Sequence, residues 1–303
     1  CSSDLKNKEG EPIVEVICPH DFYAVQRIVD PESKDCVLIR VHTPNDGVRE
    51  ELIPASTVVA KDKLMGILSG MGVPAIKNEQ DLVQAYVKRW ILTLMAKEKA
   101  GVAHRQFGWL PDKSGFIIGE KELRATEVIY SPPSQSTLGL TPMFQEKGSF
   151  HVWKDVINYY ATPGLELRAF AFFMGFGTPL MQFTELDGFM LNLVSRASGT
   201  GKTTIIHAIN SIYGKPKHLM LLPKDTINAR MSRVGVMQSL AVTMDEITNM
   251  ESGHMSQLVY DITTGRGKNR MKQHENAERL NATRFQTGLI TTSNRSEIGR
   301  AHV

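Results

Sequence analysis

The stretch that decides the fold is Ser198-Gly199-Thr200-Gly201-Lys202-Thr203-Thr204. It follows the apolar run 189–194, which is typical of a buried strand, and it precedes the segment 205–213, whose apolar residues recur at helical spacing. A strand, a glycine-rich loop, Lys-Thr and a helix, in this order, indicate a phosphate-binding loop. The glycines allow backbone N–H groups to turn inward around phosphate oxygens, and the amino end of the helix adds positive partial charge. We therefore expect all seven residues to bind ATP.

Two side chains of this loop have distinct expected roles. Lys202 is expected to reach the β- and γ-phosphates, and the Thr203 hydroxyl is expected to ligate Mg²⁺. The usual pattern G-x-x-x-x-G-K-[ST] has its first glycine where this chain has Arg196, whereas Gly199 and Gly201 keep the turn beside the phosphates free to bend. The alternative is a glycine-rich strand-to-helix turn without a ligand, and the strand and helix on both sides favour the nucleotide site.

Two acidic residues end the next apolar strand, 239–246. Asp245 is expected to hold Mg²⁺ together with Thr203, and Glu246 is expected to activate the attacking water. By themselves, two carboxylates at a strand end indicate a solvated strand exit. Their combination with the upstream loop favours the metal and catalytic roles.

A third strand, 287–294, ends in Asn294. A parallel strand between the other two would bring Asn294 to the γ-phosphate or to the attacking water, and we predict this catalytic role. The alternative is an asparagine that starts a turn, which is a common position for this residue type.

Between these strands, the segment 266–272 contains four cationic residues and glycines that allow a loop. Here the chain resembles superfamily 3 helicases and the ATPases of phage and plasmid primase-helicases. More closely, over roughly residues 12–294, it resembles an uncharacterised family of virulence-plasmid and phage ATPases that are often fused to primase modules. The matching features, besides the loop and the acids, are Thr-Gly-x-Gly-Lys-x-Arg at 264–270, Phe-x-Thr-Gly-Leu-Ile-x-Thr-x-Asn at 285–294, Phe107-Gly108-Trp109, Gly-Phe-Ile-Ile-Gly at 115–119, and Trp153.

The resemblance implies a fold, a function and partners. The fold is α/β, a P-loop NTPase with the parallel sheet of AAA+ and superfamily 3 helicases. The function is Mg-ATP hydrolysis by the motor of a phage or mobile-element DNA replication helicase. The partners are single-stranded or forked DNA contacted by Lys268, Arg270 and Lys272, further copies in a homo-oligomeric ring that supply an arginine, and a primase module or replication protein. The alternative function is a nucleotide-dependent switch that binds DNA or a partner without translocation.

Both ends of the chain look foreign. A nucleotide sequence that encodes Cys1-Ser2-Ser3-Asp4-Leu5 has a reverse complement that encodes residues 298–301. This is expected if a sequencing adapter has been read as protein. We therefore expect 1–5 and 297–303 to be adapter artefacts, to be excluded from fold reasoning, and the ATPase domain to be truncated at its carboxyl end.

The composition indicates about two domains, since 303 residues with 42% hydrophobic content can bury a large core. We expect a smaller accessory α+β domain at 6–149 and the ATPase domain at 150–296. The segment 131–142, rich in proline and serine, is typical of a linker. The net charge of +3 is too small to indicate nucleic-acid binding by itself, so the DNA prediction depends on the basic segment.

Two further observations concern the compartment. Cys18 and Cys36 have no neighbouring Cys or His at ligand spacing, which indicates neither zinc nor a disulfide framework and fits a reducing cytoplasm. The longest apolar stretch, 169–181, is shorter than the ~20 residues that span a bilayer. We therefore expect a helix buried under the ATPase sheet and no membrane partner.

Overall fold

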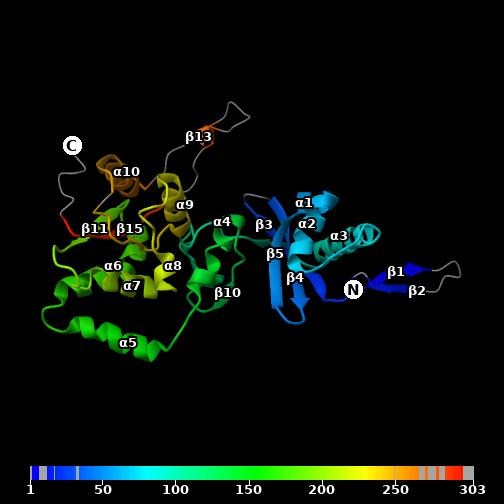
Figure 1. Cartoon of the computed structure of the whole chain (residues 1–303), viewed down its shortest axis with the longest axis horizontal. Helices are drawn as coiled ribbons and strands as arrows, with labels where there is room; N and C mark the ends of the chain where they lie inside the picture. Colours follow the sequence, from blue (N-terminus) through cyan, green and yellow to red (C-terminus); the bar gives the residue numbers. More distant parts are fainter. Residues whose placement is uncertain are drawn as a thin grey trace. The chain divides into compact units, whose positions relative to one another are not determined.

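The computed structural model describes residues 18–31, 34–248, 250–265 and 284–295. It also describes four short strands, which are β1 (Ser2–Lys6), β2 (Pro12–Val16), β13 (Arg270–Met271) and β14 (Glu278–Arg279). β1 pairs antiparallel with β2, and β13 pairs antiparallel with β14. The chain divides into two compact units, Cys1–His104 and Arg105–Val303 (Figure 1).

The first unit contains a four-stranded sheet with the strand order β5-β4-β3-β6. Its strands are β3 (Phe22–Asp30), β4 (Lys34–Thr43), β5 (Gly47–Pro54) and β6 (Gly101–Val102). β4 is antiparallel to both β3 and β5, and β6 is parallel to β3. Three helices follow β5, and they are α1 (Ala55–Val59), α2 (Lys61–Met71) and α3 (Gln80–Lys97).

One face of this sheet packs on the helices. Alternate residues of β4, namely Val37, Ile39 and Val41, are buried in one cluster with Leu68 of α2 and Val87 of α3. Every second side chain of a strand points to the same face of the sheet. Val37, Ile39 and Val41 therefore all pack against the helices. The unit therefore has a hydrophobic core of its own.

The second unit begins with a small antiparallel sheet in the order β10-β9-β8-β7. Its strands are β7 (Gly108–Trp109), β8 (Phe116–Ile118), β9 (Lys121–Leu123) and β10 (Val128–Tyr130), followed by α4 (Gln135–Leu138) and a 3₁₀ helix (Thr141–Phe144). Phe107, Ile117 and Phe144 are buried in the same cluster as Ile209, which lies further along the chain. The indole Nε1 of Trp109 donates a hydrogen bond to the Pro179 carbonyl at 3.0 Å.

The division between units therefore lies at 104/105, and not at the 149/150 boundary expected from the sequence. The segment 131–142 is folded rather than linker-like. Ser134 and Thr137 are fully buried and form a capping box at the start of α4, in which the Ser134 amide donates to the Thr137 hydroxyl at 2.9 Å. Serine and threonine are typical of linkers, but here local hydrogen bonds satisfy their polar groups and allow burial.

The centre of the second unit is an α/β layer with a three-stranded sheet in the order β11-β15-β12. The strands are β11 (Phe189–Val194), β12 (Val242–Met244) and β15 (Gly288–Ser293), and β15 is parallel to both neighbours. The helices are α5 (Phe150–Asn158), α6 (Glu166–Leu180), α7 (Lys202–Ser211), α8 (Pro216–Leu219), α9 (Ile227–Met237) and α10 (Ser252–Thr263), and further 3₁₀ turns are Tyr159–Ala161 and Met181–Phe183.

Among the described strands, the last one along the chain, β15, occupies the middle of this sheet. All six residues of β15 are buried, whereas those of β11 are half-buried or exposed. Since parallel strands end at the same edge, the residues that follow β11, β12 and β15 are brought together there. This edge holds the candidate site.

Helix α6 differs from the buried helix expected at 169–181. Ala171 and Phe172 are buried, but Phe170 and Phe173 on another side are 57% and 63% exposed. The helix is apolar on nearly all sides, so its apolar pattern alone did not reveal that only one side is covered. Among the helices of the described residues, none combines the length and the hydropathy needed to cross a membrane.

Candidate functional site at the carboxyl edge of the parallel sheet

The loop between β11 and α7 turns at two glycines. Gly199 has φ +73° and Gly201 has φ +85°, and Gly201 caps the amino end of α7, which begins at Lys202. Residues with a Cβ adopt this left-handed backbone only at a cost in free energy, so glycine is favoured at both positions. The amides of the first turn of a helix have no partner within the helix, which makes this end suited to an anion.

Arg196 stands outside this turn. Its side chain is exposed, and it is not among the described residues with positive φ. The backbone at this position therefore does not require glycine. This explains how the loop keeps its shape although the first glycine of the usual pattern is absent.

Lys202 links the loop to the end of β15. Its Nζ atom donates to the carbonyl oxygens of Ser195 and Ala197, at 3.0 Å and 3.3 Å, and to Oδ1 of Asn294 at 3.0 Å. The ammonium group is thus held where the loop, β11 and β15 meet. The structure brings Lys202 and Asn294 together, although 92 positions separate them in the sequence.

The two acids at the end of β12 contact the same cluster. Thr203 Oγ1 donates to Asp245 Oδ2 at 2.9 Å, and Asn294 Nδ2 donates to Glu246 Oε2 at 2.9 Å. Asn294 therefore connects Lys202 to Glu246 through one amide group. Its orientation is unambiguous, because an ammonium group only donates and a carboxylate only accepts.

The oxygens of Thr203 and Asp245 are suited to Mg²⁺. This ion prefers oxygen ligands and usually keeps several waters, and it needs only one or two protein carboxylates beside substrate phosphates. Within the described part of the chain, no group of three or more His, Cys, Asp and Glu side chains could hold a metal by itself. The donor set therefore fits a metal that arrives with a phosphate ligand, and not a permanent all-protein metal site.

Sequence reasoning missed one residue that contacts the loop, Arg168, and one polar residue within the sheet, Asn192. Arg168 of α6 donates from Nη2 to the carbonyl of Thr200 at 2.8 Å, which fixes the loop from outside. Asn192, in the middle of β11, accepts from Thr291 Oγ1 at 3.1 Å and donates from Nδ2 to Ser293 Oγ at 3.0 Å. A polar residue inside an apolar strand was a usable signal for Asn192. No local pattern marks Arg168, whose role depends on a contact 32 positions away.

The predicted DNA-binding residues are not placed. Lys268 and Lys272 lie outside the described residues, and only the backbone of Arg270 is described, in β13, where it is paired with Arg279. Their contact with DNA stays a prediction.

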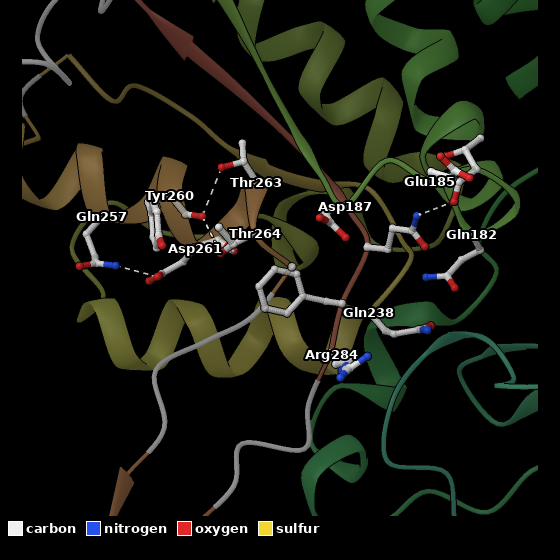
Figure 2. Close-up of a pocket in the computed structure, with 14 residues that line it drawn as sticks. Gln182, Glu185, Asp187, Gln238, Gln257, Tyr260, Asp261, Thr263, Thr264 and Arg284 are labelled. Atoms are coloured by element: carbon white, nitrogen blue, oxygen red, sulfur yellow. Dashed lines mark hydrogen bonds between the residues drawn. The ribbon is translucent and has the colours of Figure 1, made fainter.

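A cavity of about 880 Å³ lies at the opposite edge of the sheet, where β11 and β15 begin (Figure 2). Glu185 and Asp187 line one side of it, and Tyr260 and Asp261 of α10 line another. Gln257 Nε2 donates to Asp261 Oδ1 at 2.6 Å. Among the described residues that line it, three carboxylates, Glu185, Asp187 and Asp261, outnumber the one cation, Arg284, so the loop is better suited to a polyphosphate than this cavity.

Comparisons with known proteins agree with an α/β fold. The family model described as domain of unknown function DUF927 matches residues 3–282. No curated protein matches the chain. A solved structure titled as the active helicase Cch of SCCmec type IV is similar over 96% of this chain, with 17% identity and a TM-score of 0.68, and the chain spans 53% of that protein. The apo structure of the NrS-1 C-terminal region matches with 13% identity and a TM-score of 0.35, over 88% of this chain and 53% of that one, which is too low for an argument.

Proposed function

The chain belongs to the DUF927 family, and we propose that it is a Mg²⁺-dependent ATPase, the motor of a DNA helicase from a phage or another mobile element. One observation carries this proposal. Lys202, Glu246 and Asn294 form one hydrogen-bonded group at the carboxyl edge of the sheet, next to Thr203 and Asp245. A cation, a carboxylate, an amide and a pair of metal-binding oxygens are the groups that phosphoryl transfer to water requires.

Each residue has a defined role in this proposal. The loop amides of 198–204 and Lys202 bind the phosphates. Thr203 and Asp245 hold the metal ion, which when bound neutralises negative charge on the phosphate oxygens. Glu246 accepts a proton from the attacking water, and Asn294 orients that water or the γ-phosphate. The half-buried Lys202 and the more exposed Glu246 both contact the Asn294 amide, so one side chain connects the phosphate-binding cation to the base.

The helicase part of the proposal is supported by the fold. The Cch protein, which its title calls an active helicase, shares this fold at a TM-score of 0.68. The chain spans about half the length of that protein, so unwinding, a homo-oligomeric ring and a primase partner are proposals for the whole protein. Lys268, Arg270 and Lys272 are proposed to contact single-stranded or forked DNA.

Nucleotide binding is the first test. We expect Lys202→Ala to abolish binding of a fluorescent ATP analogue while the chain stays folded, as judged by circular dichroism. Glu246→Gln keeps the shape of the side chain but cannot accept a proton, so this variant should bind ATP and lose hydrolysis by orders of magnitude. Unchanged ATP binding in Lys202→Ala would overturn the site.

Strand displacement is the second test. ATP-driven unwinding of forked DNA by the full-length protein supports a motor, and Glu246→Gln is the matched control for its dependence on hydrolysis. Hydrolysis without unwinding would instead favour a nucleotide-dependent switch that binds DNA or a partner.

A further inference from the structure

A single buried hydroxyl contacts both acids of the candidate site. Thr292, in the central strand β15, is fully buried. Its Oγ1 donates to Asp245 Oδ1, and it accepts a hydrogen bond from the backbone amide of Glu246 at 2.8 Å. We infer that Thr292 is a positioning residue that fixes both the metal-binding carboxylate of Asp245 and the backbone of Glu246, which carries the catalytic carboxylate. This inference rests on the proposed ATPase function.

The direction of the two hydrogen bonds is fixed by chemistry. An amide N–H can only donate, so the Thr292 oxygen must be its acceptor. The single hydroxyl proton is then free for the Asp245 carboxylate, which can only accept. The result is a continuous series from the Glu246 amide through the Thr292 hydroxyl to Asp245, in which each bond polarises the next. The side chain of valine has the same shape but cannot provide either bond.

Asp245 is thereby held on both oxygens. Thr203 donates to Oδ2 at 2.9 Å, and Thr292 donates to Oδ1. The carboxylate is half-buried, and two bonds to its two oxygens leave no freedom to rotate without losing one of them. Thr292, together with Thr203, therefore fixes the orientation of the Asp245 carboxylate plane.

Glu246 is held through its backbone. Its φ is +53°, a conformation that costs free energy in a residue with a Cβ. Such a conformation persists only where neighbours enforce it, and here Thr292 makes two of the bonds that do so. Its hydroxyl accepts from the Glu246 amide, and its carbonyl accepts from the Ile247 amide at 2.9 Å. This turn directs the Glu246 side chain to Asn294.

The test compares three variants of the whole chain. Thr292→Val removes both bonds and keeps the shape, and Thr292→Ser keeps the hydroxyl. Thr291→Val is the matched control, because Thr291 is also fully buried in β15 but donates to Asn192 Oδ1 at 3.1 Å and not to the acids. The readouts are kcat, the affinity for a fluorescent ATP analogue with Mg²⁺ and with EDTA, and the melting temperature.

We expect Thr292→Val to lower kcat by about 10-fold to 100-fold, the range for one hydrogen bond to a charged group. Affinity in EDTA should be unchanged, because Lys202 and the loop are untouched, whereas the gain in affinity on adding Mg²⁺ should shrink. Thr292→Ser should restore both properties. Thr291→Val should lower only the melting temperature.

Two results would overturn the inference. Thr292→Val with wild-type kcat and wild-type Mg²⁺ response would show that the hydroxyl does not position the acids. Equal losses in Thr291→Val would assign the effect to the stability of β15. In both cases the wild-type chain binds and hydrolyses ATP, so the proposed function survives. A wild-type chain that does not bind ATP overturns the proposed function and this inference together.

Discussion

Glu246 occupies a strained backbone position, and replacing it is expected to separate stability from activity. Its φ of +53° lies in the left-handed region, where glycine has no steric penalty. Glu246→Gly and Glu246→Ala both remove the carboxylate and its hydrogen bond with Asn294, so both should abolish hydrolysis. They differ in one respect, because alanine keeps the strained Cβ and glycine does not. We therefore expect Glu246→Gly to be the more stable of the two inactive variants.

The size of the difference follows from two opposing terms. A residue with a Cβ in the left-handed region costs about 1–3 kcal/mol in the folded state. Glycine loses more conformational entropy on folding than alanine does, and this offsets about 0.5–1 kcal/mol of its advantage. The net difference in the free energy of unfolding is then about 1 kcal/mol in favour of glycine. For a folding unit the size of Arg105–Val303, this raises the melting temperature by about 2–4 °C.

Scanning calorimetry of the two variants measures this difference, and ATP turnover is recorded on the same samples. Glu246→Gln is a third reference, because it keeps the Cβ and a side chain of the same shape while losing the base. A Glu246→Gly protein that melts at or below the temperature of Glu246→Ala would refute the reasoning. The backbone at Glu246 would then carry no strain, and the hydrogen bonds to Thr292 of β15 would not be needed to hold it.

Three further predictions concern other parts of the chain. Arg168→Ala should weaken ATP affinity about tenfold, the effect of one charge-assisted hydrogen bond to the Thr200 carbonyl, and equal affinities by fluorescence titration would contradict it. Replacing Lys268 or Lys272 with Ala should weaken single-strand binding without sequence preference and lower the salt slope by about 0.7 per lost contact, whereas a salt slope equal to that of the wild type excludes the contact. Burial and the nearby carboxylates raise the pKa of the Cys36 thiol to about 11, so below that pH it stays protonated and native Cys36 should resist alkylation at pH 8, which mass mapping checks.

Much of the candidate site could be predicted from the sequence, because its residues follow strands. The loop, the acids and Asn294 each follow an apolar run that forms a strand. Because the strands are parallel, the residues after each strand lie at the same edge of the sheet. The structure brings Lys202, Glu246 and Asn294 into one hydrogen-bonded group, as this reasoning requires. These site residues could be located because each one is marked by a short local pattern that is visible in a single sequence.

What the sequence did not reveal depends on contacts between distant segments. The residues 131–142 have the composition of a linker, yet Ser134 and Thr137 are buried because they satisfy each other. Arg168 is a single cation in an apolar helix, and only the folded chain places it beside Thr200. In the sequence, nothing distinguishes Thr292 from the other threonines in or next to the same strand. Its importance comes from the neighbouring strand β12, which ends beside it.

The middle position of β15 explains why the site is built as it is. A central strand touches both neighbours, so its end can contact the loop that follows β11 and the acids that follow β12 at the same time. Asn294 uses this position with one planar amide, whose oxygen accepts from Lys202 and whose nitrogen donates to Glu246. An aspartate at 294 would place a carboxylate against Glu246, and a leucine would satisfy neither partner. Asparagine therefore bridges a cation and an anion without adding charge between them, and the strand that carries it must lie between the other two.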